Sequence, residues 1–394
     1  MLLEISLFIL AGILAGTITG LVPGIHINLI GAFLISLSTS TLYFIDSLYL
    51  ITFIISMAIT HTFLDFIPSI FLGCPDTDTE LSILPGHELL KKGQGHSAVL
   101  LTAYGSLAAI LILIIIAFPS ILLLSKINNL IKGFIPYLLI IVSIILISLE
   151  KKKFSALSIF LLTGFLGYLV LNLNMSQPLL PLLTGLFGAS NLILSIKTKP
   201  LIPKQEILNP KIKLLKPLLG ATIASPLCSF LPGLGSGQAA IIGNIISKCN
   251  QKGFLVLLGA TNTLVMGFSF LSLYAITKTR TGATVAINQI LNPLTTNILI
   301  LILIITLISG IISFFLTKKL SELFSQKINK INYTKVSIIT LLILLVIVFL
   351  VSSWIGVLIL ILSTTTGIYS INSGVRRTNM MGCLLIPSII LYLF

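Results

Sequence analysis

Two Pro-Gly pairs interrupt long hydrophobic stretches of this chain, Pro23-Gly24 near its start and Pro232-Gly233 in its second half. Proline lacks an N–H and clashes with the preceding turn, while glycine tolerates positive φ, so each pair is expected to unwind a helix. In lipid, the freed backbone groups must line a cavity or meet a ligand. A half-helix that begins after Gly24 or Gly233 would present N–H groups and positive partial charge to an anion.

Small and polar residues follow each Pro-Gly pair. They are His26 and Asn28 in the first half, and Gly235, Ser236, Gly237 and Gln238 in the second. Small residues let a ligand approach the backbone closely, so we expect both segments to contact a substrate. The alternative is a kinked and tightly packed helix, because glycine and proline are frequent in membrane helices.

A polar loop also occurs in each half, after the hydrophobic segment that follows the Pro-Gly pair. The first loop carries Pro75, Asp76, Thr77, Asp78 and Thr79, and the second carries Lys278, Arg280, Thr281 and Thr284. Threonine hydroxyls can bind carboxylate or phosphate oxygens, and the two cations can neutralise them, arginine in a bidentate manner. These residues are therefore candidate substrate ligands, and two loops bathed in water are the alternative.

His61 and Asp65 are four residues apart inside a hydrophobic segment, so they share one face of a helix. An ionisable pair within a membrane helix indicates a proton relay or an ion site, and histidine titrates near neutral pH. We expect His61, Asp65, Asp76 and Asp78 to couple transport to Na⁺ or H⁺. The alternative for the first two is an interfacial pair near the end of the helix.

The composition defines what must position these residues. Only 9% of the 394 residues are charged and 56% are hydrophobic, whereas a soluble domain needs about a quarter of its residues charged. The uncharged runs are continuous rather than alternating, which favours membrane helices over a barrel. The net charge of +14 lies in short Lys-rich loops, so a nucleic-acid partner is rejected. The four cysteines show no metal or redox spacing, and no cofactor is expected.

The Lys-rich loops also divide the chain. We expect a first transmembrane half over residues 1–196, a cytoplasmic linker over 197–216 and a second transmembrane half over 217–394. A second Lys-rich loop is expected at Lys318–Lys335. The start of the chain lacks a basic segment before its first hydrophobic stretch, which favours a retained segment over a cleaved signal. Counting crossings between the loops predicts an all-α bundle of two inverted repeats, whose site lies near the midplane.

Several stretches resemble the large membrane subunit of tripartite tricarboxylate transporters (TctA-like permeases). They are Thr17–His26, the loop around Pro75, Leu84–Gly95 and Phe230–Gly237, and the similarity covers Gly12–Ser106 and Gly220–Ile290 best. The resemblance implies carboxylate transport coupled to an ion gradient, with a small membrane subunit and an extracytoplasmic binding protein as partners. Asp76 stands where the family tends to have glycine, and this additional negative charge disfavours a polyanion such as citrate.

These observations leave four candidate functions. The leading hypothesis is a secondary permease of the cell membrane for a small anionic, carboxylate solute. One alternative is a translocase for lipid phosphates of the polyprenyl-phosphate type. Another is an intramembrane metal-dependent enzyme, although the chain has no H-E-x-x-H or G-x-S-x-G motif. The last is a structural scaffold. We expect a transporter rather than an enzyme.

Overall fold

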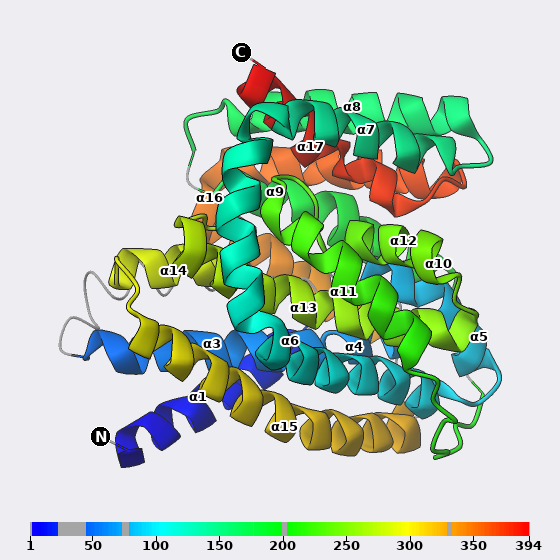
Figure 1. Ribbon diagram of the computed structural model, residues 1–394. Helices are drawn as coiled ribbons and strands as arrows, with labels where there is room; N and C mark the ends of the chain where they lie inside the picture. Colours follow the sequence, from blue (N-terminus) through cyan, green and yellow to red (C-terminus); the bar gives the residue numbers. More distant parts are fainter. Residues whose placement is uncertain are drawn as a thin grey trace.

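The computed structural model describes residues 2–22, 45–72, 79–175, 177–198, 203–328 and 333–393. Within them the secondary structure is helical, without strands (Figure 1). Seven spans are long and apolar enough to cross a membrane. They are α1 (Leu2–Leu21), α3 with α4 (Ser47–Leu64 and Phe66–Leu72), α6 (Gly95–Ile131), α8 (Lys153–Leu171), α13 (Gln251–Ile276), α15 (Thr296–Lys327) and α16 (Tyr333–Asn372). The predicted all-α transmembrane bundle is thereby confirmed.

Shorter helices fill the space between these spans. They are α5 (Ile83–Lys91), α7 (Ile135–Ser148), α9 (Leu179–Leu183), α10 (Ser190–Thr198), α11 (Leu215–Phe230), α12 (Ser236–Ser247), α14 (Gly282–Ile290) and α17 (Gly382–Leu393). A π-helical stretch, Thr184–Ala189, joins α9 to α10. A 3₁₀ turn, Arg377–Met381, precedes α17.

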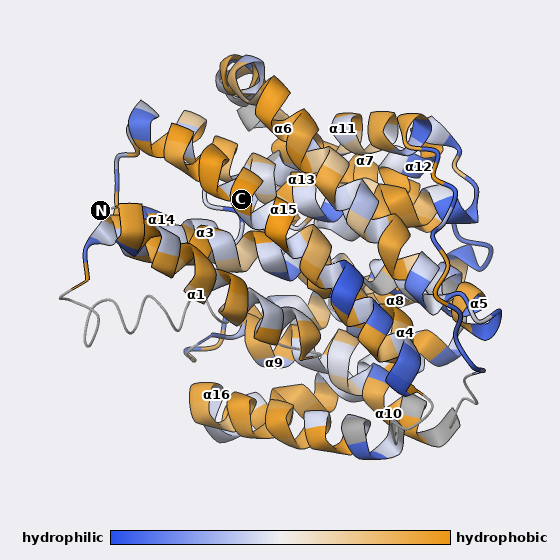
Figure 2. Ribbon diagram, turned by 90° about the horizontal axis from the view of Figure 1, so that it is seen from below, coloured by the Kyte–Doolittle hydropathy of each residue, from blue (hydrophilic) through white to orange (hydrophobic). Residues whose placement is uncertain are grey.

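Two of the spans are interior and the others face outward. The α3–α4 span and α13 are each 94% buried, whereas α1 and α16 are 28% and 22% buried. The outer helices present leucine and isoleucine to their surroundings, as Figure 2 shows along α1 and α16. Lipid is the solvent for those side chains, so the polar residues of α3, α4 and α13 are held away from it.

Glycines bring pairs of helices into backbone contact. A Cβ atom on Gly105 of α6 would overlap the Val256 carbonyl of α13, and one on Gly259 of α13 would overlap Thr102 of α6. Small residues allow membrane helices to approach this closely, since lipid supplies no hydrophobic force between them. Thus α6, from the first half of the sequence, and α13, from the second, pack as one unit.

The long helix α16 is two helices folded against each other. Ser353 has φ 56° and ψ −162°, which are not helical values. Leu341 and Leu345, before Ser353, line one apolar groove together with Leu360 and Thr364, after it. Residues this far apart would be separated by roughly 30 Å in a straight helix, at 1.5 Å per residue. The chain therefore reverses at Ser353.

Two Lys-rich segments differ from the expected loops. Lys318–Lys335 is not a loop over its whole length, because α15 continues to Lys327 and His96 Nδ1 lies 2.7 Å from Ser321 Oγ. In the linker, Glu206 N donates to Gly93 O at 2.8 Å, and the Gln205 side chain accepts from Gly95 N at 2.9 Å. The linker is thus fastened to the α5–α6 turn. The division at residues 197–216 stays a prediction.

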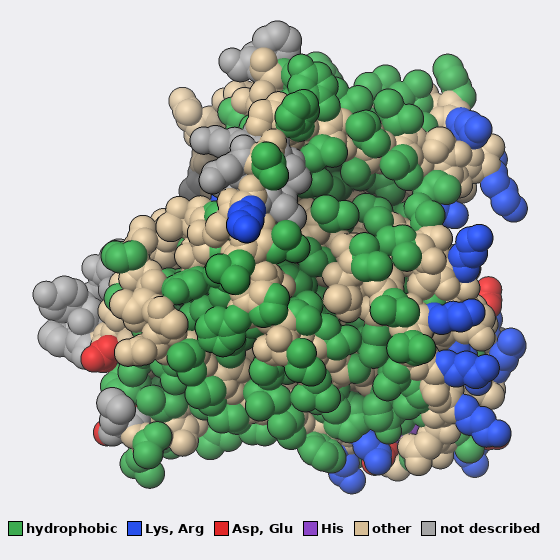
Figure 3. Space-filling view, in the orientation of Figure 1, with side chains coloured by type: hydrophobic (Ala, Val, Ile, Leu, Met, Phe, Trp, Pro, Cys, Tyr) green, Lys and Arg blue, Asp and Glu red, His purple; other side chains and the backbone are tan. Residues whose placement is uncertain are grey.

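Basic residues gather at one end of the molecule, which we call the Lys-rich end. Figure 3 shows Lys and Arg along one edge and hydrophobic side chains over most of the remaining face. Several segments meet there: the linker, α5, the start of α13, the α7–α8 turn and the α16–α17 turn. They are joined by contacts such as Gln251 Nε2 to Glu88 Oε2 at 2.6 Å and Lys152 Nζ to Ser373 O at 3.0 Å.

Candidate functional site

The two interior spans cross at a cluster of buried polar side chains. Asn262 Nδ2 of α13 donates to Asp65 Oδ2 at 2.7 Å, and the hydroxyls of Thr62 and Thr263 lie 3.2 Å apart. None of these four residues is more than 5% exposed. We call Thr62, Asp65, Asn262 and Thr263 the buried polar crossing. A carboxylate here avoids the cost of an unpaired buried charge by accepting hydrogen bonds.

The two spans run in opposite directions. The start of α13 contacts α5, which follows the end of α4, through Gln251 and Glu88. At its other end α13 leads into α14, which packs on α3. The crossing therefore lies within each of the two spans and not at an end where both of them stop.

Helix α1, which precedes the first Pro-Gly pair, ends beside this crossing. Thr19 Oγ1, in the last turn of α1, lies 3.1 Å from His61 Nδ1. A Cβ atom on Gly20 would lie 2.8 Å from Leu64 Cβ and 3.3 Å from Asp65 N. Helix α1 then ends at Leu21, two residues before Pro23. His61 and Asp65 are both buried, so the structure places this pair inside the bundle and not at an exposed interface.

The second Pro-Gly pair breaks a helix, as predicted. Helix α11 ends at Phe230, Leu231 is extended, Gly233 has φ +77° and α12 begins at Ser236. A side chain at this positive φ would be strained, which explains the glycine. Gln238 Oε1 accepts from Gly235 N at 2.8 Å, so the first turn of α12 is closed partly by its own side chain.

This second break also approaches the crossing. Ser229 Oγ, near the end of α11, donates to Val265 O of α13 at 3.2 Å. Val265 is about one helical turn from Asn262, which holds Asp65. Helix α1, which ends before Pro23, and helix α11, which ends before Pro232, therefore both reach the same buried cluster.

Arg280 is attached to the second break. Its Nη1 donates to Leu231 O at 2.6 Å, where the C-terminus of α11 carries negative partial charge. Thr281 and Thr284 cap α14: Thr281 N donates to Thr284 Oγ1 at 3.0 Å, and Thr284 N donates to Thr281 Oγ1 at 3.3 Å. Lys278 lies on the same connection and is partly buried. All four predicted ligands lie on the α13–α14 connection or the start of α14.

Several predicted site residues lie outside the described part of the chain: Pro23, Gly24, His26, Asn28, Pro75, Asp76, Thr77 and Asp78. Thr79 is described and buried, and Ser69 Oγ donates to its hydroxyl at 2.9 Å. Pro232, Gly235, Ser236 and Gly237 lie at the second break. The substrate-binding and ion-coupling roles of all these residues stay predictions.

Asn262, whose amide donates to Asp65, was not among the residues predicted from the sequence. Its signal was a Thr261-Asn262-Thr263 run in the middle of an otherwise apolar segment. Carboxylate, amide and hydroxyl oxygens are the ligands that Na⁺-like hard cations take, and a buried carboxylate beside a histidine can also carry a proton. Among the described residues no three His, Cys, Asp or Glu side chains are grouped to hold a metal ion.

The fold and this cluster define a class: a multi-pass integral membrane protein whose interior helices carry ionisable groups. The family model for the tripartite tricarboxylate transporter TctA family matches residues 7–382. The chain therefore belongs to the TctA family and is a membrane transporter. It is 33% identical over 404 aligned residues to "Uncharacterized protein MJ1079" of Methanocaldococcus jannaschii, with 98% of each chain covered. No solved structure matches it.

Proposed function

We propose that this chain is a secondary transporter for a small carboxylate anion and that Asp65 binds the coupling cation, Na⁺ or H⁺. One observation carries the proposal. The approaches to both interrupted helices, through Thr19 and Ser229, converge on the crossing where Asp65 meets Asn262. Broken helices at the midplane offer backbone N–H groups to an anionic substrate and carbonyls to a coupling ion.

Helix directions support the inverted repeat. In the first half α1 runs parallel to α3, because Gly12 faces Phe53 while Gly20 faces Leu64. In the second half α11 runs parallel to α13, because Pro217 approaches Gly253 while Ser229 contacts Val265. Since α3 and α13 are antiparallel, the two interrupted helices enter from opposite ends. We assign the Lys-rich end to the cytoplasm by the positive-inside rule.

The family adds two proposed partners. A tripartite transporter has a large membrane subunit, and we propose that this chain fills that place beside a small membrane subunit and an extracytoplasmic binding protein. Lys278 and Arg280, on the connection between α13 and α14, are then the cations that we propose bind the solute. Their end of α13 is opposite to the Lys-rich end.

A thermal-shift titration of the purified chain tests the proposal without the partners. We expect a carboxylate such as succinate or malate to raise the melting temperature, with a further rise in Na⁺ or on acidification. A ligand specific for the folded state adds stability as RT ln(1 + [L]/Kd). The cation effect should vanish in Asp65→Asn and persist in Glu206→Gln, an acid of the linker. A cation effect of the same size in Asp65→Asn would refute the role of Asp65, and no shift with any carboxylate would refute the function.

A further inference from the structure

A cavity lies at the Lys-rich end, apart from the buried polar crossing. It has a volume of about 820 Å³ and lies between α5, α12, the start of α13, the α7–α8 turn and the α16–α17 turn. Binding pockets for small organic molecules range over about 300–1,000 Å³. None of the residues that line it was predicted from the sequence to bind a ligand.

Cations line one part of this cavity. Lys91 comes from α5, and Arg376 and Arg377 come from the α16–α17 turn, so segments distant in sequence bring positive charge to one place. Glu88 is the carboxylate among the lining residues, and it accepts from Gln251 Nε2 at 2.6 Å. Positive charge thus exceeds negative charge on the walls, which favours an anion.

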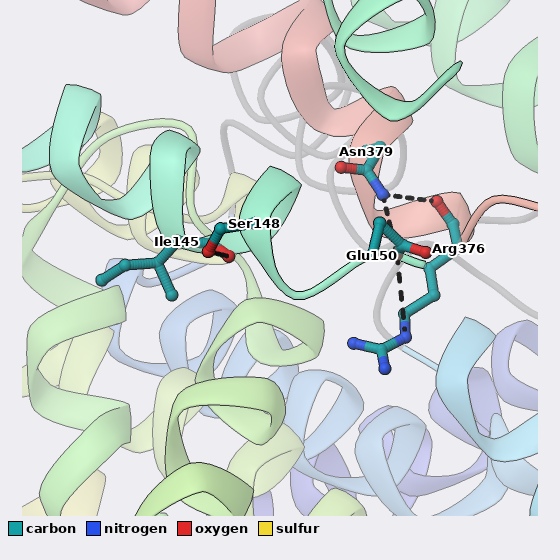
Figure 4. Close-up of polar contacts among 5 residues, drawn as sticks. All are labelled: Ile145, Ser148, Glu150, Arg376 and Asn379. Carbon is teal, nitrogen blue, oxygen red and sulfur yellow. Dashed lines mark hydrogen bonds and ion pairs between the residues drawn. The ribbon is translucent and has the colours of Figure 1, made fainter. Parts of the chain in front are cut away.

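Arg376 is held in position by a buried acid. Glu150 is 8% exposed, its Oε1 lies 3.7 Å from Arg376 Nε, and Asn379 Nδ2 donates to the same oxygen at 3.1 Å. Figure 4 shows Glu150 between Arg376 and Asn379. This contact engages Nε of a side chain that is 49% exposed, so the terminal nitrogens can still reach an anion. A charge that is already oriented loses less entropy when it binds.

The rest of the wall is apolar or neutral. Leu149, Ile241, Ile245 and Phe254 supply hydrocarbon surface. The His87 Nε2 atom is buried and has no hydrogen-bond partner among the described residues. Burial lowers the pKa of His87 to about 4, with Lys91 and Arg377 adding to the effect, so this ring is neutral near pH 7. Such walls suit an occupant with its own carbon skeleton better than a small hydrated ion.

We propose that this cavity is a cytoplasmic binding site for an organic anion that carries carboxylate on an apolar carbon skeleton. Lys91, Arg376 and Arg377 bind the carboxylate, and Phe254 with its aliphatic neighbours contacts the carbon. The proposal rests on the proposed transport function for the source of the anion, which is the transported solute on the cytoplasmic side. Binding itself does not require transport.

Calorimetry on the full chain in detergent tests the site, with adipate, benzoate and inorganic phosphate as probes. Adipate and benzoate should bind, and phosphate at least tenfold more weakly. Lys91→Gln and Arg377→Gln should each raise the Kd for adipate at least tenfold, and Arg377→Lys should recover part of the loss. The matched control is Lys319→Gln, a cation on α15 that is 73% exposed and does not line the cavity.

Three results would overturn the site: no binding of any carboxylate, phosphate binding as tightly as adipate, or equal weakening in Lys319→Gln. Lys91 is exposed, so its variant keeps the test valid if Arg377→Gln does not fold. The cation effect on the melting temperature, which Asp65→Asn should abolish, should persist in Lys91→Gln, and this separates the cavity from the proposed coupling role. Adipate binding that is present in phosphatidylcholine nanodiscs and absent in phosphatidylglycerol nanodiscs would assign the cavity to a lipid headgroup and refute the soluble anion.

Discussion

Two buried acid–amide pairs occupy different surroundings in this protein. Asp65 accepts from Asn262 where two interior helices cross, and Glu150 accepts from Asn379 at the Lys-rich end, where Arg376 lies 3.7 Å away. Arg376 places a positive charge beside the Glu150 carboxylate, whereas the side chain that donates to Asp65 is a neutral amide. We therefore propose that the first pair works in the transport cycle and that the second positions Arg376.

Replacing the two acids should have very different effects on uptake. We expect Asp65→Asn to reduce solute uptake into proteoliposomes at least 100-fold, because the amide cannot carry a cation or a proton. Glu150→Gln should keep uptake within about tenfold of the wild type, since Arg376 would lose orientation and not its charge. Radiolabelled uptake under imposed Na⁺ and proton gradients measures both. Equal losses in the two variants would remove the distinction between the pairs.

Replacing either amide should lower the free energy of unfolding, with the larger loss at Asn262. Asn262→Ala leaves the buried Asp65 carboxylate without this donor. The free energy of unfolding should fall by about 2 kcal/mol, which is in the range for hydrogen bonds to charged groups. Asn379→Ala should cost about 1 kcal/mol, because Arg376 still lies beside Glu150. Thermal unfolding of each variant in the same detergent gives the order. A larger loss for Asn379→Ala would contradict it.

Acid should destabilise the fold through His87, which lies at the Lys-rich end. The pKa of His87 is lowered from 6.5 to about 4, so the unfolded chain binds a proton there that the folded chain does not. The contribution of His87 to the free energy of unfolding is fully present above about pH 6.5 and is lost as the pH falls toward 4. About 2 kcal/mol of it is lost at pH 5. His87→Gln should flatten this part of the curve of melting temperature against pH. A wild-type slope that persists unchanged in His87→Gln would refute the assignment.

The smallest effect is expected for the surface ion pair near this end. Lys319 Nζ lies 4.0 Å from Glu322 Oε2, and the lysine is largely exposed. Exposed pairs contribute about 0–1 kcal/mol and weaken with salt. Glu322→Gln should therefore leave the melting temperature within error of the wild type at 0.5 M NaCl. A salt-resistant loss would show that this pair, like the one at Glu150, is part of a built site.

The sequence predicted those features that have a local chemical cause. Pro232 and Gly233 break their helix because of their own backbone limits, and the span Ser47–Leu72 agrees with the hydropathy of that segment. The reversal at Ser353 carried only a weak signal, an uncharged run long enough for two crossings with Gly356 near its middle, where a Cβ atom would overlap Ser352. Asn262 and Arg376 gained their partners from segments about 200 residues away, and no local pattern specifies such contacts.

The glycine contacts between α6 and α13 limit how this transporter can move. Backbones that touch at Gly105 and at Gly259 leave no layer of side chains on which one helix could slide past the other. These two helices come from different halves of the sequence, so a cycle that rocks one half against the other as separate rigid bodies would have to break that contact at every turnover. The hinge of alternating access is therefore expected to lie between two groups of helices, at least one of which contains helices from both halves of the sequence.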